Sequence, residues 1–358
     1  MIQKLQISQF RNYSEKSFVF SPRLTLVAGP NTAGKTSLLE AIMLIATGTS
    51  FRAERDRDMI AFEGDVSRVK AVYSSIDSEL LEVVLTRGLV LGKTVPLKKY
   101  LVDGIARRYA DFAGRMPAVL FWPEDLRLIT GSPARRRSYF DTILSQTDRM
   151  YRRAIMSYEK ALRVRNKLLR LVREGVRVNP EEFDYWTNTL VTQGAVIHTA
   201  REALTLYANA LPFDRNADCS FTIHYDHSTI TSDRLREYHD AERAAGVTLV
   251  GPHRDDFYLT KNHDHDSELH NFGSRGEQRL GVLWLKMAEM QYIEQQLHVS
   301  PLLLLDDIFS ELDANHRGLV VRLIGSHQTI MTTTDKHLVN GISADTMIEL
   351  DIQQEQSC

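Results

Sequence analysis

The feature that most constrains this fold is the segment of residues 29–36, GPNTAGKT, which matches the phosphate-binding pattern G-x-x-x-x-G-K-[ST]. The apolar, partly β-branched run at residues 24–28 predicts a buried strand before it, and residues 36–45 predict a mostly buried helix after it. In such a unit, backbone N–H groups face the phosphates and the helix dipole adds partial positive charge. The chain therefore contains a candidate nucleotide-phosphate site, with a chance glycine-rich turn as the alternative.

The chemistry of this loop assigns roles to its last residues. Lys35 is expected to reach the β- and γ-phosphates of ATP, and Thr36 to offer its hydroxyl group to Mg²⁺. The residues expected to contact the nucleotide from this segment are Gly29, Pro30, Asn31, Thr32, Ala33, Gly34, Lys35, Thr36 and Ser37.

Bulk composition narrows the class of protein. A chain of 358 residues predicts one large domain with an insertion, or two domains. The net charge of −2 means that any nucleic-acid-binding surface must be local. The two cysteines, Cys219 and Cys358, have no metal-ligand or redox spacing, which suits a reducing cytosol. The N-terminus lacks the core of a signal peptide and no apolar run approaches the ~20 residues of a membrane span, so a cytoplasmic protein without membrane contact is expected.

A second set of motifs lies near the C-terminus. Four leucines at residues 302–305 predict a buried strand of a parallel sheet, and two carboxylates follow at its C-terminal end, where ligands bind in open α/β sheets. This is a Walker B pattern. Asp306 is expected to hold Mg²⁺, and Asp307 to polarise the water that attacks ATP. Upstream, Ser274 and Gly276 begin a predicted helix and form a second anion site, 32 residues before Asp306.

The middle of the chain changes in character. Residues 123 to about 216 have the period of helices, whereas residues 247–250 predict a short strand. From residue 135 to residue 177 there are 13 Lys and Arg against four Asp and Glu, a local net charge of +9. Two interpretations stay open, a solvated helix face and a surface for the phosphate backbone of DNA. The candidate DNA-binding residues are Arg135, Arg136, Arg137, Arg152 and Arg153.

The order of these motifs resembles the ABC-type ATPases, in which the signature of one protomer caps the γ-phosphate held by the phosphate loop of another. Lys35 and Ser274 are 239 residues apart, which resembles the split heads of the SMC-like DNA-repair ATPases. The insertion is nevertheless too short, and too often broken by Gly and Pro, to be a long coiled coil. Residues 5–13, 121–137 and 251–256 narrow the resemblance to the RecF family.

The resemblance implies further site residues and partners. It adds Arg11, Asn12, Arg52, Asp313 and Thr334 to the nucleotide-binding set, and gives Lys35, Ser274 and Asp307 catalytic roles. It implies an ATP-dependent homodimer that binds gapped or junction DNA, hydrolyses ATP slowly, and cooperates with RecR and RecO in loading RecA. The family more often has glutamine where this chain has Arg275 and Glu277, which bears on the affinity of the dimer.

The expected fold is α/β. An ABC-type ATPase head with a mixed sheet is formed by residues 1–122 and 247–358, and a mainly helical lobe is formed by residues 123–246. Two other functions stay open. One is the ATPase subunit of a transporter. The other is a binding module that ATP gates with negligible turnover.

Overall fold

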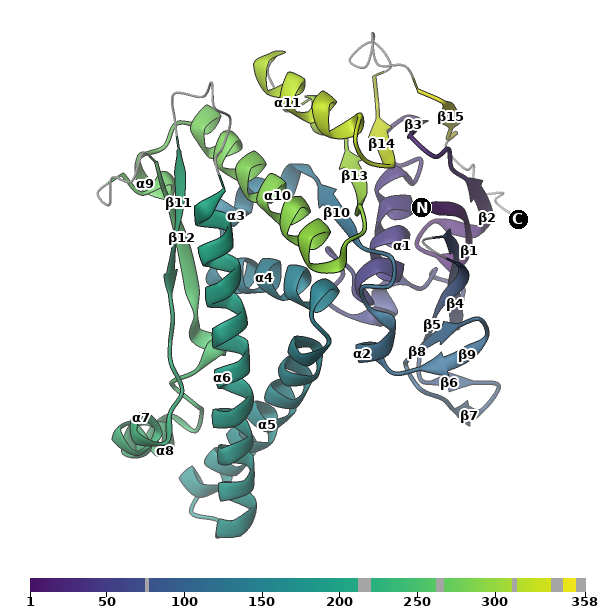
Figure 1. The fold of residues 1–358 in the computed structure, drawn as a ribbon. Coiled ribbons are helices and arrows are strands. Elements are labelled where there is room, and N and C mark those ends of the chain that lie inside the picture. The colour runs from purple at the N-terminus through teal and green to yellow at the C-terminus, as the bar shows by residue number, and fades with distance from the viewer. Residues whose placement is uncertain (75–76, 212–219, 262–266, 311–313, 336–343, 352–358) are drawn as a thin grey trace. The chain divides into compact units, whose positions relative to one another are not determined.

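The computed structural model describes the chain except residues 75–76, 212–219, 262–266, 311–313, 336–343 and 352–358 (Figure 1). Its contacts divide the chain into two compact units. We call Met1–Asp125 with Ile293–Cys358 the split unit, and Leu126–Tyr292 the central unit. No helix in the described part of the chain is long and apolar enough to span a membrane.

The second boundary of the central unit differs from the expected one. The unit extends to Tyr292 instead of ending at residue 246. The reason lies in the contacts of residues 251–261, since strand β12 (Asp256–Lys261) pairs with β11 (Phe221–Asp226), and Asp255 bonds the guanidinium group of Arg201. Residues after 246 are therefore part of the packing of the central unit.

The split unit contains a five-stranded parallel sheet with the order β10-β13-β14-β3-β15. Its strands are β3 (Leu24–Ala28), β10 (Ala118–Phe121), β13 (Leu302–Asp306), β14 (Thr329–Thr333) and β15 (Thr346–Glu349). The three central strands are buried along their whole length, which explains the unbroken run of leucines in β13. The two ends of the chain thus build one sheet, as the expected split head requires.

A second, antiparallel sheet of the split unit has the order β2-β1-β4-β5-β8-β9. Its strands are β1 (Ile2–Phe10), β2 (Tyr13–Val19), β4 (Val66–Ser74), β5 (Ser78–Thr86), β8 (Lys98–Val102) and β9 (Ile105–Arg107). Helix α1 (Lys35–Thr47) contacts strands of both sheets, and its apolar side chains are part of the main core. Short elements complete the unit: η1 (Asp56–Met59), β6 (Leu89–Val90), β7 (Lys93–Thr94), α2 (Tyr109–Phe112), most of η2 (Pro123–Leu126), η4 (Ile308–Ser310) and α11 (Ala314–Ile324).

The central unit is mainly helical, which confirms the expected inserted lobe. Its two long helices, α5 (Arg149–Arg173) and α6 (Pro180–Ala210), pack against each other (Figure 1). The unit also contains α3 (Arg127–Thr130), α4 (Pro133–Thr147), α7 (Ser232–Glu237), α8 (His239–Ala245), η3 (Pro252–Arg254), α9 (Leu269–Phe272) and most of α10 (Arg275–Leu297).

The predicted strand at residues 247–250 is wrong. In the structure this segment is irregular, and side chains satisfy its backbone groups. The Thr248 N–H group donates to Asn166 Oδ1 and the Leu249 N–H group donates to Glu242 Oε1, each at 2.8 Å. Since these donors already have partners, the segment does not need a ladder of strand hydrogen bonds.

Candidate functional site

The loop between β3 and α1 has the geometry of an anion site. Gly34 precedes α1 with φ 97°, and a Cβ atom there would lie 2.7 Å from both Asn12 Nδ2 and Tyr13 Oη, so only glycine fits. No described side chain caps the N-terminus of α1. Lys35 Nζ donates to the carbonyl oxygens of Gly29 and Pro30 at 2.8 Å each. The ammonium group thus lies against the loop that would surround the phosphates.

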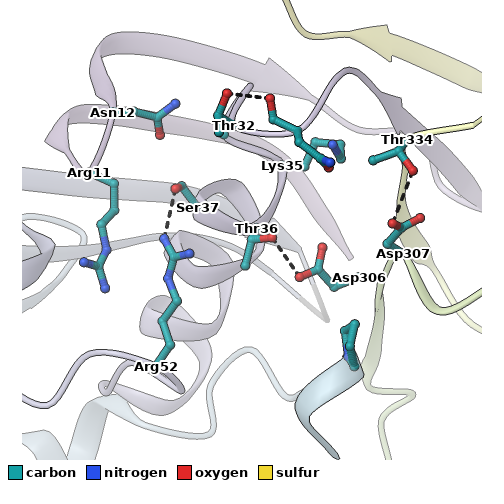
Figure 2. Close-up of a pocket in the computed structure, with 13 residues that line it drawn as sticks. Arg11, Asn12, Thr32, Lys35, Thr36, Ser37, Arg52, Asp306, Asp307 and Thr334 are labelled. Carbon is teal, nitrogen blue, oxygen red and sulfur yellow. Dashed lines mark hydrogen bonds between the residues drawn. The ribbon is translucent and has the colours of Figure 1, made fainter. Parts of the chain in front are cut away.

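Asp306 lies at the end of β13 and faces the start of α1. The Thr36 hydroxyl group donates to its Oδ2 at 2.9 Å (Figure 2). The Thr332 hydroxyl group donates to its Oδ1 at 2.8 Å. Burial raises the pKa of Asp306, and the hydrogen bonds from Thr332 and Thr36 act against that effect. Two hard oxygen ligands, from Thr36 and Asp306, therefore meet at one point, which fits Mg²⁺.

Asp307 has a different environment from Asp306. It follows the strand with φ 50°, its N–H group donates to Thr332 Oγ1, and its Oδ2 accepts a 3.3 Å hydrogen bond from the Thr334 hydroxyl group. Burial lowers the pKa of Lys35, while Asp307 and Asp306 raise it. The two neighbouring carboxylates can therefore perform different chemical tasks.

One pocket of about 700 Å³ joins most of the expected nucleotide residues. Figure 2 shows these side chains around it. Its lining consists of Arg11, Asn12, Asn31, Thr32, Gly34, Lys35, Thr36, Ser37, Arg52, Pro123, Asp306, Asp307 and Thr334. Gly29 and Pro30 contact Lys35 through their carbonyl oxygens, and Ala33 is buried in the core. Asp313 lies outside the described residues.

Two arginines of this pocket share one buried carboxylate, that of Glu40 on α1. Arg11 donates to it through Nε at 2.8 Å and through a terminal nitrogen at 2.6 Å, and Arg52 donates through Nε at 2.8 Å. Arg52 also donates to Ser37 Oγ at 3.0 Å. Glu40 was absent from the expected site residues. A signal existed, since it is the sole charged residue between Thr36 and Thr47 in an otherwise apolar helix.

Ser274 and Gly276 lie in the central unit, at the exposed start of α10. Ser274 and Glu277 form a reciprocal cap, because the Ser274 N–H and hydroxyl groups donate to Glu277 Oε2 and the Glu277 N–H group donates to Ser274 Oγ. Lys261 donates to the other oxygen of Glu277 at 2.6 Å, and these hydrogen bonds, led by that from Lys261, lower the pKa of Glu277 to about 2. Glu277 therefore stabilises the signature turn as a carboxylate.

Three of the five expected DNA-binding arginines bind partners inside the central unit. Arg136 forms a bidentate ion pair with Asp256, and Arg137 donates to the Asp255 carbonyl group. Arg152 is buried and donates to the carbonyl oxygens of Ser145 and Gln146. We therefore do not extend the DNA-binding expectation to these three. Arg135 is half-buried and Arg153 is exposed.

Arg201 on α6 is a structural centre that the sequence interpretation missed. Its buried guanidinium group donates to Asp255 Oδ2 and Asp141 Oδ1, each at 2.8 Å, and to the carbonyl oxygen of Pro252 at 2.9 Å. These contacts explain why residues 251–256 form a recognisable motif. Arg201 falls into the apolar period of α6, three residues before the buried Leu204 and four after the buried Ile197, and that placement was a usable signal.

Comparison with known proteins identifies the family. The family described as RecF/RecN/SMC N terminal domain matches residues 1–357. The DNA replication and repair protein RecF of Moorella thermoacetica is 35% identical over 347 residues, covering 94% of this chain and 91% of its own. The RecF of Roseiflexus castenholzii is 36% identical, covering 92% of each chain. The chain belongs to the RecF family. Its members are named for DNA replication and repair, and a transporter subunit is not among these relatives.

Solved structures of RecF are similar to this chain over nearly its whole length. A structure described as the recombination mediator protein RecF-ATPrS in the RecFOR pathway has a TM-score of 0.85 and 26% identity, covering 98% of this chain and 95% of its own. The RecF-ATP structure has the same TM-score and coverage at 25% identity. An Smc head bound to the C-winged helix domain of ScpA is similar in fold alone, with a TM-score of 0.52 and 15% identity. The expected ABC-type ATPase head, with sheets and helices from both ends of the chain, is thereby confirmed.

Proposed function

We propose that this chain binds ATP in the pocket of the split unit and uses it to control the binding of DNA during recombinational repair in the cytoplasm. The observation that carries the proposal is the convergence of four segments on one pocket. Lys35 and Thr36 come from α1, Asp306 and Asp307 from the end of β13, Thr334 from the end of β14, and Arg52 from the loop after α1. This combination of cations, hydroxyl groups and carboxylates suits a polyphosphate with Mg²⁺.

The residues that would hold Mg²⁺ are Thr36 and Asp306, whose oxygens already lie 2.9 Å apart. Bound there, the ion neutralises charge on the phosphates. The residues of the chain supply the rest. Lys35 would move from the carbonyl groups of Gly29 and Pro30 to the β/γ-phosphates, and Asp307 would orient a water molecule and accept its proton.

The proposed active form is a dimer of two chains arranged head to tail. Ser274 and Gly276 are exposed at the start of α10, a 23-residue helix whose N-terminus favours anions. In the dimer they would contact the γ-phosphate held by the pocket of the other chain. Slow hydrolysis would then remove that contact and release the dimer. ATP shifts the equilibrium only by binding the dimer more tightly than the monomer.

For the DNA surface we propose the outer face of α5. We define the α5 stripe as its exposed cations, Arg149, Arg153, Lys160, Arg163, Lys167 and Arg170. Their spacing of three, four or seven residues places them on one side of the helix, opposite the buried Tyr151, Tyr158 and Leu169. The stripe extends about 32 Å at 1.5 Å per residue, which is long enough to follow the phosphates of about one turn of duplex DNA.

RecR and RecO are proposed partners because of family membership, and gapped or junction DNA is the proposed ligand. The alternative function is a binding module that ATP gates with negligible turnover.

An Asp307→Asn variant tests the proposed chemistry. We expect it to retain ATP affinity within about threefold and to hydrolyse ATP at least about 10²-fold more slowly, because a general base contributes that much. Lys35→Ala is the comparison variant, and it should lose ATP affinity. Steady-state phosphate release and equilibrium ATP binding measure the two effects. Unchanged turnover in Asp307→Asn would contradict the role of Asp307, and a wild-type protein without turnover would support the nucleotide-gated module.

A further inference from the structure

The carboxylate of Glu40 is the point at which two pocket arginines are fixed. Its side chain is fully buried, and its two oxygens accept four hydrogen bonds. Three come from Arg11 and Arg52, and the fourth from the Ser50 hydroxyl group at 2.5 Å. Every strong acceptor position of the carboxylate is therefore used, and the arginines have no freedom to leave it without breaking charge-assisted bonds.

The partners of Glu40 come from separate segments of the split unit. Arg11 lies in the turn between β1 and β2, while Ser50 and Arg52 lie in the loop after α1. The network continues outward, since Arg11 donates to the carbonyl oxygen of Asp58 and Arg52 donates to Ser37 Oγ. Glu40 itself is four residues after Thr36 on α1, about 6 Å along the helix axis. The helix that begins at the phosphate loop thus orients both arginines.

The side chains of the two arginines remain partly accessible, 21% for Arg11 and 32% for Arg52, and both line the pocket (Figure 2). Glu40 does not line it. We propose that Glu40 is a positioning residue that holds Arg11 and Arg52 ready for the phosphates of the bound nucleotide. The inference rests on the proposed binding of ATP in this pocket, and it adds a residue that acts through its partners without touching the ligand.

If Glu40 acted only through its negative charge, its effect on nucleotide affinity would be the opposite of that of a positioning residue. Glu40 is an anion near a site for a polyphosphate anion, so removing its charge should strengthen nucleotide binding if it acts only as a nearby charge. If it acts by positioning, removing it releases two guanidinium groups and weakens binding. The sign of the change in ATP affinity therefore separates the two roles. A merely structural role predicts a loss of stability without either change.

The test measures equilibrium dissociation constants for Mg-ATP and Mg-ADP on the full chain carrying Glu40→Gln. We expect affinity for Mg-ATP to fall about tenfold or more, since hydrogen bonds to charged groups contribute that much. In a background with Arg11→Ala and Arg52→Ala, the same Glu40→Gln change should alter affinity by less than about twofold, because the groups it positions are gone.

Glu82 offers a matched control in the same unit. It is a nearly buried carboxylate that pairs with two cations, Arg68 at 2.9 Å and Lys70 at 3.6 Å, and none of the three lines the pocket. Glu82→Gln should leave nucleotide affinity unchanged, and thermal unfolding of both variants compares their stability. Tighter or unchanged Mg-ATP binding in Glu40→Gln would overturn the inference. So would an equal loss of Mg-ATP affinity when Glu40→Gln is made in the background with Arg11→Ala and Arg52→Ala. A wild-type chain that binds no nucleotide would overturn the proposed function, and this inference with it.

Discussion

At the scale of single residues, the central unit depends on buried polar groups that hold specific protonation states. His253 is an example. Its Nε2–H group donates to the carbonyl oxygen of Thr248 at 3.1 Å, and in the neutral ring Nδ1 accepts a 2.7 Å hydrogen bond from the Tyr158 hydroxyl group. A protonated ring would lose this acceptor, because both of its nitrogens are then donors. Burial lowers the pKa of His253 to about 4, and Arg254 and Arg137 contribute in the same direction, against the Thr248 bond and Asp255.

The protonation of His253 predicts a loss of stability in acid. The unfolded chain binds a proton below pH about 6.5 whereas the folded chain does so only near pH 4, so stability is complete above 6.5 and falls between these values. We expect a loss of about 2 kcal/mol in the free energy of unfolding between pH 7 and pH 5 from this residue. Urea titrations of the wild type and of His253→Gln would measure it. An equal dependence on pH in both proteins would contradict the assignment.

At the scale of elements, sequence and structure agree best where one period dominates. The leucine run of β13, the phosphate loop and α1 could be read directly, because a strand of a parallel sheet is buried on both faces and the loop has a fixed pattern. The period of α5 likewise predicts one packed and one exposed face.

The features that the sequence could not predict depend on contacts between residues that are distant in sequence. Arg136 and Arg152 look like surface cations in a basic stretch, but Asp256 and the carbonyl oxygen of Ser145 bind them. In the Arg11–Glu40–Arg52 cluster, Glu40 binds one arginine 29 positions before it and another 12 positions after it. A local pattern records charge and period, and it does not record which partner a folded chain brings to a given side chain.

The α5 stripe gives the prediction that belongs to this scale. Replacing Arg153, Arg163 and Lys167 by alanine should weaken DNA binding and lower the magnitude of the slope of log affinity against log salt by roughly 0.9 per lost phosphate contact. Replacing the exposed Lys4, Lys16 and Lys93 of the split unit is the matched control. Binding measured at several salt concentrations gives both quantities. A slope that stays the same in the α5 variant would mean that the stripe is a solvated helix face.

At the scale of the whole molecule, the proposed dimer would use residues of both units at its nucleotide sites. The phosphate loop and Walker B residues lie in the split unit, and the signature residues Ser274 and Gly276 lie in the central unit. In the proposed dimer, each chain would supply its phosphate loop to one site and its signature residues to the other. Two chains arranged head to tail would then complete two equivalent sites, in which nucleotide is buried between protomers.

The most direct test of this account is the mass of the Asp307→Asn variant in solution, measured by light scattering. The variant is chosen because slow hydrolysis preserves the ATP-bound state. We predict a mass of one chain without nucleotide or with Mg-ADP, and of two chains with saturating Mg-ATP. A second change, Ser274→Arg, should keep ATP bound but abolish the dimer. A protein that remains a monomer with Mg-ATP bound would contradict the shared site, and with it the proposed control of DNA binding by dimerisation.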